Sequence, residues 1–228
     1  MSLALPGDEQ ARAAIMRELE SRFAPEDEAL RNNITRTQEQ YHHSGQITPL
    51  QGKLFQVLAL TCGARKILEI GTMTGYSGVW LARGLTSGGK LITLEAQPDY
   101  AETARTTFAE AGISDRVEIR IGAALDLLPA LVAEAPFDLI FIDADKVHNP
   151  QYLDWALRLS RAGSLIIADN IVRGGQAFQT PPPNESAAGV AAYTRIILEH
   201  PRLVSVALSH DDMNNGIDGY SISVVLEE

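Results

Sequence analysis

Short apolar runs alternate with longer amphipathic segments along most of this 228-residue chain. The first run, residues 67–70, is interrupted only by Glu69 and leads into two glycines, Gly71 and Gly75. Apolar residues then recur at helical spacing from Ser77 onward. A short run rich in β-branched residues is typical of a strand buried on both faces of a parallel sheet. The pattern therefore predicts a strand, a glycine turn and a helix in succession.

The same alternation continues to the end of the chain. Repeated strand–helix units imply a doubly wound, mostly parallel α/β sheet with right-handed crossovers and helices on both faces. The last two strands have no helix between them, so we expect seven strands with the final one antiparallel. Beyond the first unit, strands are predicted at residues 90–95, 117–121, 137–143, 164–169, 204–208 and 220–226, and helices at 98–111, 123–134, 151–161 and 186–200.

Three further helices are predicted before the first strand, at residues 8–20, 27–41 and 51–62. The first two are polar around most of their circumference, which indicates that they lie on the domain rather than inside it. The chain length suits one α/β domain with a full core and is short for two. We therefore expect a single domain over residues 1–228, with residues 1–50 as a helical extension packed on or over the site.

Charge and cysteine content limit the possible partners and the cellular compartment of the protein. With 19 basic and 29 acidic residues the formal net charge is −10, which disfavours nucleic acid or an anionic membrane as the main partner. The single cysteine, Cys62, excludes an internal disulfide and fits a reducing compartment. No apolar run approaches the length of a membrane span and no signal peptide is evident. We expect a cytoplasmic protein.

The glycine turn is a candidate ligand site, because ligands of open α/β sheets bind beyond the carboxyl ends of strands. Glycine lets a ligand approach the backbone, although such a turn can also be purely structural. The spacing from Gly71 to Gly75 differs from the G-x-G-x-x-G dinucleotide fingerprint. Glu95 ends the second strand and could accept two hydrogen bonds from a ribose diol. Alone, Glu95 does not separate a nicotinamide dinucleotide from S-adenosylmethionine (SAM).

Acidic residues follow two later strands of the predicted sheet. Asp143-Ala144-Asp145-Lys146 follows one strand, and Asp169-Asn170 follows the next. Both strands should end at the same sheet edge as Gly71. Hard oxygen donors there suit Mg²⁺, Ca²⁺ or Mn²⁺, and no histidine or cysteine lies at zinc-like spacing. Two acids and a lysine also describe a solvated loop, so the prediction depends on all three segments occurring together.

These segments resemble a known family from about residue 51 to residue 228. The sequence Glu-Ile-Gly-Thr-Met-Thr-Gly-Tyr-Ser at 69–77 resembles the SAM loop of class I methyltransferases. With the two acidic segments, it is more narrowly similar to the cation-dependent O-methyltransferases, the family of caffeoyl-CoA and catechol O-methyltransferases. The resemblance implies a Rossmann-like fold and a SAM site formed by Glu69, Gly71, Thr72, Gly75, Ser77, Glu95, Ala124 and Asp143.

The resemblance also implies the chemistry. It assigns Asp143, Asp169 and Asn170 as ligands of a divalent cation, and Lys146 as the general base beside Asp143. A catechol would chelate the cation, which acts as a Lewis acid, and its phenolate would attack the SAM methyl in line. Lys146 must be neutral to take the proton, and a nearby cation favours that form. If the cation alone ionises the substrate, Lys146 only positions it.

The match weakens where the acceptor pocket should form. Arg173 stands where the family usually has an aromatic residue, residues 179–184 contain three prolines, and residues 210–219 are longer and more acidic than a short glycine turn. We predict a SAM- and cation-dependent O-methyltransferase for a small catechol-like acceptor, and the family implies a homodimer. Two alternatives are a catalytically silent SAM-binding module and an NAD-dependent dehydrogenase, although the dehydrogenase predicts a third glycine that this turn lacks.

Overall fold

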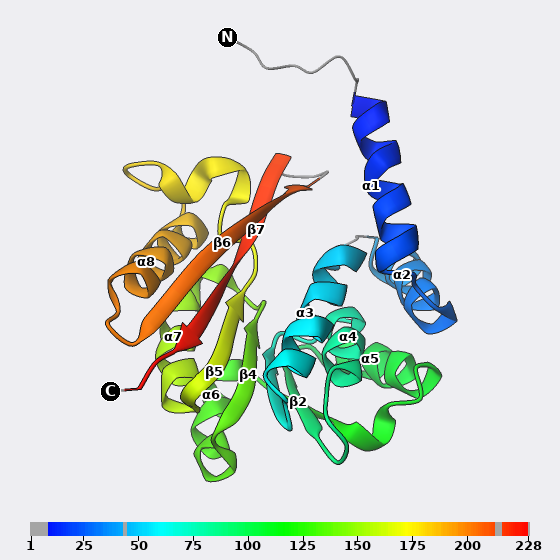
Figure 1. Cartoon of the computed structure of the whole chain (residues 1–228), viewed down its shortest axis with the longest axis horizontal. Helices are drawn as coiled ribbons and strands as arrows, with labels where there is room; N and C mark the ends of the chain where they lie inside the picture. The colour runs from blue at the N-terminus through cyan, green and yellow to red at the C-terminus, as the bar shows by residue number, and fades with distance from the viewer. Residues whose placement is uncertain (1–8, 43–44, 213–215, 228) are drawn as a thin grey trace.

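The computed structural model describes residues 9–42, 45–212 and 216–227 (Figure 1). Within these ranges, seven strands form one sheet in the order β3-β2-β1-β4-β5-β7-β6. This confirms the predicted doubly wound α/β fold. The strands are β1 (Lys66–Ile70), β2 (Lys90–Glu95), β3 (Val117–Ile121), β4 (Phe137–Ile142), β5 (Ser160–Ala168), β6 (Leu203–Asp212) and β7 (Gly216–Val225).

Strand direction matches the prediction as well. The neighbouring pairs from β3 to β5 are parallel, whereas β7 runs antiparallel to both β5 and β6. The chain starts at β1, builds outward through β2 and β3, and then returns to place β4 on the other side of β1. The gap between the carboxyl ends of β1 and β4 is therefore the topological switch point, where open α/β sheets bind their ligands.

Helices cover both faces of the sheet, with α2 to α5 packed on one face and α6 to α8 on the other, while α1 projects from the body (Figure 1). Alternate strand residues supply the two cores: Ile67 belongs to the same core as Phe55 and Trp80, and Leu68 to the core that contains Tyr193. The helices are α1 (Glu9–Phe23), α2 (Glu28–Tyr41), α3 (Pro49–Thr61), α4 (Tyr76–Arg83), α5 (Pro98–Glu110), α6 (Ala124–Leu127), α7 (Asn149–Arg158) and α8 (Glu185–Glu199), with 3₁₀ helices at Ser114–Arg116, Leu128–Glu134, Lys146–His148 and Arg173–Phe178.

Three local predictions differ from the structure. Residues 123–134 were expected to form one helix, but α6 ends at Leu127 and a 3₁₀ helix follows, with Pro129 in its first turn where no backbone N–H is needed. Strand β5 begins at Ser160, four residues earlier than expected from residue 164. Strands β6 and β7 have ten residues each, so the last hairpin is longer than predicted. Residues 213–215 lie outside the described part.

Helix α2 has a buried polar face, which its largely polar sequence did not predict. The Asn33 amide donates to the backbone oxygen of Thr74 at 2.6 Å, and the hydroxyls of Thr37 and Thr74 are 2.8 Å apart. Asn33 and Thr37 are both fully buried. The helix therefore fastens the glycine turn from the outside. None of the described helices combines the length and apolar character that crossing a bilayer requires.

Candidate active site

The turn after β1 brings the backbone of two strands into contact. Gly71 has φ +104°, and a β-carbon at this position would collide with the backbone oxygen of Asp143 after β4. The Gly71 N–H donates to the oxygen of Leu94 in β2 at 3.0 Å. Gly75, with φ +92°, precedes the first turn of α4. Only glycine combines this backbone conformation with such a close approach.

Glu69 lies beneath this turn and is fully buried. One of its carboxylate oxygens accepts a hydrogen bond from Ser77 and the other from Thr93, both at 2.6 Å. Burial raises the pKa of Glu69 from 4.5 to about 7, against the opposing effect of the two hydroxyl donors. The carboxylate thus connects β1 to β2 and to the start of α4. Ser77, which donates one of these hydrogen bonds, also lines the cavity described below.

Glu95 fastens the turn from the second strand. Its carboxylate accepts hydrogen bonds from the backbone N–H groups of Met73 at 2.7 Å and Gln97 at 2.9 Å. Burial raises the pKa of Glu95 despite these donors. A carboxylate has about four acceptor positions, so two donors leave capacity for a ligand diol.

A cavity opens beside the turn at the switch point. Gly71, Thr72, Ser77 and Asp143 were predicted from the sequence and come together in its wall. The predicted residues Glu69, Gly75, Glu95 and Ala124 lie outside its lining, and Ala124 begins α6 next to the end of β3. The full lining among the described residues is Gly45, Gln46, Ile47, Gly71, Thr72, Met73, Thr74, Tyr76, Ser77 and Asp143.

The acidic residues lie at the same sheet edge. The N–H of Asp143 donates to the oxygen of Ile70 in β1 at 2.8 Å, and the N–H of Asp169 donates to Ile142 in β4 at 3.0 Å. Asp143 and Asp169 therefore follow adjacent strands at matching heights. Their charges interact, since burial and then the charge of Asp143 raise the pKa of Asp169 from 3.8 to about 7.

Among the described residues, Lys146 is the basic side chain that forms an ion pair at this edge, with Asp143. Its Nζ lies 2.7 Å from Asp143 Oδ1, and only 7% of the residue is exposed. The backbone of α8 packs against the Lys146 turn at Gly189, where a β-carbon would collide with the Lys146 carbonyl oxygen. The lysine is therefore held in place from both sides.

Two residues at this edge were not predicted from the sequence. The side-chain amide of Gln51, at the start of α3, donates to Asp169 Oδ1 at 2.8 Å. Asp218, in the last hairpin, accepts from the Asn170 amide at 3.2 Å. The motif Thr48-Pro49 does predict a helix start, and Gln51 completes its capping box. No local signal points from Gln51 to Asp169 or from Asp218 to Asn170.

The fold and the glycine turn define a class I methyltransferase architecture. The chain belongs to the O-methyltransferase family, whose model matches residues 20–217. Similar proteins include a catechol O-methyltransferase of Mycobacterium tuberculosis, 44% identical over 181 residues, which are 78% of this chain and 80% of that protein. A catechol O-methyltransferase of Niastella koreensis is 46% identical over 153 residues, 66% of this chain and 69% of that protein.

Two solved structures extend the likeness to bound SAM and its product, S-adenosylhomocysteine (SAH). An O-methyltransferase from Bacillus cereus in complex with SAH superposes with a TM-score of 0.88 at 41% identity, covering 93% of this chain and 97% of that one. The O-methyltransferase TomG from Streptomyces achromogenes, which is involved in tomaymycin synthesis and was solved with SAM, gives a TM-score of 0.91 at 36% identity, covering 96% and 99%.

The protein is a SAM-dependent O-methyltransferase. Family membership decides against the NAD-dependent dehydrogenase, and it favours an enzyme over a silent binding module.

Proposed function

We propose that this enzyme methylates one hydroxyl of a small acceptor with two adjacent hydroxyls, with the help of a divalent cation. The observation that carries the proposal is the placement of Asp143 and the buried Asp169 at the ends of adjacent strands, beside Asn170 and next to the SAM cavity. The relatives named catechol O-methyltransferase support the same acceptor class.

The donor set fits a hard cation. Two carboxylates and an amide oxygen suit Mg²⁺, Ca²⁺ or Mn²⁺, with water and acceptor oxygens completing the coordination. Lys146 supplies one positive charge to two acidic groups, so the edge can accommodate further positive charge. No group of three or more His, Cys, Asp or Glu side chains in the described ranges could hold a metal, so the proposed set has only two carboxylates and takes Asn170 as its third protein ligand. When bound, the cation would polarise the acceptor hydroxyls and favour their ionisation.

The chain's own groups bind and orient the two substrates. We assign the turn residues Gly71, Thr72 and Gly75 and the hydroxyl of Ser77 to SAM, with Glu69 acting through Ser77. Glu95 would hold the ribose diol, and the segment beginning at Ala124 would lie against the adenine. Asp143 faces both the SAM cavity and the acidic edge, so it would align the two reacting molecules.

We assign Lys146 the role of receiving the acceptor proton. Its Nζ is held beside Asp143 at the acidic edge, where the acceptor hydroxyls would lie. A second cationic group at this edge would favour the neutral form of the lysine, which can then accept a proton. A charged lysine at the same position would instead steer a phenolate.

The end of segment 1–50 would cover the site, since Gly45, Gln46 and Ile47 line the proposed SAM cavity, whereas α1 projects from the body. We also propose a homodimer in the cytoplasm. Apolar side chains that a second copy could cover lie exposed on α1 (Ile15, Met16, Leu19) and on β6 (Val204, Val206, Leu208). Size-exclusion chromatography with light scattering tests the dimer, and a monomeric mass would contradict it.

Methyl transfer with and without chelator tests the reaction. We expect SAM and 3,4-dihydroxybenzoate to give a methylated product in Mg²⁺, none in EDTA, and recovery with excess Mg²⁺. 3,5-Dihydroxybenzoate, whose hydroxyls are not adjacent, is the control acceptor and should not react. Equal rates with and without EDTA would contradict the proposed dependence on a divalent cation. Methyl transfer to both acceptors would contradict the proposed requirement for adjacent hydroxyls.

A further inference from the structure

A buried carboxylate lies behind the acidic edge, in the last hairpin. Asp218 is 1% exposed. Its Oδ1 accepts from the backbone N–H groups of Val172 at 3.1 Å, Arg173 at 2.9 Å and Gly219 at 2.8 Å. Its Oδ2 accepts from Asn170 Nδ2 at 3.2 Å. All four of these partners are N–H groups, so the carboxylate acts here as an acceptor and nothing else.

These bonds hold a strained segment. Asn170 and Arg173 have φ +55° and +51°, in the left-handed region that residues with a β-carbon rarely adopt. Between them, the Ile171 N–H donates to the oxygen of Gly219 at 2.8 Å. The segment that follows β5 is thus fastened to β7 by main-chain and side-chain bonds together.

The bond to Asn170 fixes which end of its amide faces the site. A side-chain amide has one donor end and one acceptor end, whereas a carboxylate only accepts. Asp218 therefore selects the orientation in which Nδ2 points to the hairpin and Oδ1 points away from it. We propose that Asp218 is a positioning residue that presents the Asn170 oxygen to a divalent cation. This inference rests on the proposed cation dependence. Partners of this kind behind a ligand commonly change metal affinity by about 10- to 100-fold.

The variant Asp218→Asn tests the orientation with little change of shape. Its amide oxygen can keep the three backbone N–H donors, so its NH₂ group must face Asn170. Two NH₂ groups cannot pair, and the Asn170 amide should flip to offer its oxygen to position 218. The end then facing the cation is a donor and cannot act as a ligand. We expect the dissociation constant for Mn²⁺ to rise about tenfold or more.

Exchanging the two side chains should restore the pairing. In the double variant Asn170→Asp with Asp218→Asn, the amide at position 218 donates to the new carboxylate, whose second oxygen faces the cation. We expect the double variant to bind Mn²⁺ about tenfold or more tighter than Asp218→Asn alone. Because Asn170→Asp also adds a carboxylate ligand, the same change with Asp218 intact is the reference, and a purely structural role for Asp218 predicts an equal gain in Mn²⁺ affinity in both backgrounds.

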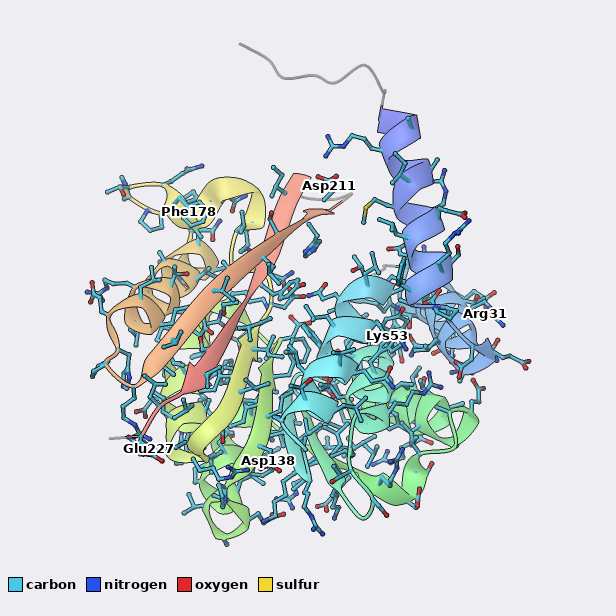
Figure 2. The ribbon with its side chains drawn as sticks, in the orientation of Figure 1. Arg31, Lys53, Asp138, Phe178, Asp211 and Glu227 are labelled. Atoms are coloured by element: carbon cyan, nitrogen blue, oxygen red, sulfur yellow. The ribbon has the colours of Figure 1, made fainter. Side chains whose placement is uncertain are left out.

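Mn²⁺ binding in the presence of SAH, measured by electron paramagnetic resonance, is the readout, with SAH affinity in EDTA and the unfolding temperature as checks of folding. Asp138→Asn is the matched control, because Asp138 also accepts from two backbone N–H groups, those of Arg65 and Lys66, but near the opposite end of the sheet (Figure 2). It should leave Mn²⁺ binding unchanged.

The outcomes separate this inference from the proposed function. Absence of Mn²⁺ binding to the unaltered enzyme would overturn both. Normal binding that Asp169→Ala abolishes, with Asp218→Asn unchanged within about twofold, would overturn only the positioning role. Should Asp218→Asn fail to fold, the double variant decides: recovery of folding and Mn²⁺ binding supports the role, and failure of either overturns it.

Discussion

The side-chain amide of Gln51 donates a 2.8 Å hydrogen bond to the buried carboxylate of Asp169, across 118 residues of sequence. The Gln51 oxygen accepts from the backbone N–H of Thr48 at 3.4 Å, which completes the capping box of α3. One side chain therefore joins the first turn of a helix to the end of a central strand. Because Gly45, Gln46 and Ile47 immediately precede this turn and line the cavity beside the glycine turn, the bond connects the cavity wall to the acidic edge.

Replacing Gln51 with alanine should destabilise the protein. The change removes a donor from a buried carboxylate and half of a capping box, for a combined loss of about 2 kcal/mol in the free energy of unfolding. Urea unfolding in EDTA measures the loss. Gln56→Ala, on the same helix, removes a side chain that accepts from Lys53 and should cost about 0.5 kcal/mol or less. Equal losses in the two variants would show that the Asp169 bond contributes nothing.

Substitutions of Lys146 can distinguish a general base from a residue that only positions the acceptor. Lys146→Met should lower kcat by about 100-fold or more, because a general base contributes that much, and SAH affinity should change little. Lys146→Arg keeps the positive charge but cannot give up a proton. If Lys146 is the base, both variants should be equally slow. Substantial activity in the arginine variant would assign the lysine to steering alone. Lys90→Met, which removes an exposed partner of Glu118, is the control and should retain full activity.

The number of strands, their directions and the position of the glycine turn could be predicted from the sequence, because the strands, the helices between them and the turn each have a local pattern. An apolar run followed by glycine predicts a buried strand and a turn, and helices between strands impose parallel pairing. The positions of Asp143 and Asp169 at the ends of neighbouring strands could be predicted in the same way, since each residue follows an apolar run that ends at the shared edge. Contacts between remote segments have no such pattern: Asp211, at one end of the last hairpin (Figure 2), pairs with Arg12 of α1 at 3.1 Å.

The supporting residues could not be predicted, because their partners are remote in sequence. Asn33 contacts Thr74 across 41 residues and Asp218 contacts Asn170 across 48. In a helix or hairpin sequence these polar side chains are indistinguishable from solvated ones. They become buried only when α2 packs against α4 and α5 and β7 pairs with β5 and β6, and burial is what makes their hydrogen bonds obligatory.

Glu95 should control affinity for SAM and SAH. Glu95→Gln keeps the size of the side chain but replaces one acceptor oxygen with a donor, so it would lose a backbone bond or a charge-assisted bond to the ribose. We expect the SAH dissociation constant to rise about tenfold, which corresponds to one such bond. Isothermal titration calorimetry provides the value. Asp99→Asn, which changes an exposed carboxylate at the start of α5, is the control for the change in SAH affinity. An unchanged SAH affinity in Glu95→Gln would remove Glu95 from the SAM site.

Glu69 should make stability fall as pH rises. Its pKa is about 7 in the folded protein against 4.5 ordinarily, so between these values the folded state holds a proton that the unfolded state releases. Unfolding free energy therefore decreases with rising pH in that window, by at most about 1.4 kcal/mol per pH unit for this group. In Glu69→Gln the slope should be shallower, with part remaining because the pKa of Asp169 is also raised.

Denaturant unfolding at several pH values across this window measures the Glu69 effect. Glu118→Gln is the comparison, because salt bridges lower the pKa of Glu118 and its slope has the opposite sign at lower pH. If Glu69→Gln and the unaltered protein have the same slope, the buried carboxylate is ionised throughout and the assignment is wrong.

Gly71 and Gly88 form a matched pair that separates backbone strain from close contact. Both have positive φ, +104° and +73°, but a β-carbon at Gly88 would meet nothing within 4 Å, whereas one at Gly71 would collide with the Asp143 backbone. Gly88→Ala should cost about 1 kcal/mol and leave activity intact. Gly71→Ala must also move Asp143 away from β1, so it should cost at least about twice as much and weaken SAH binding about tenfold. Unfolding and SAH titration of both variants measure the difference. Identical behaviour would mean that the contact between the ends of β1 and β4 does not shape the site.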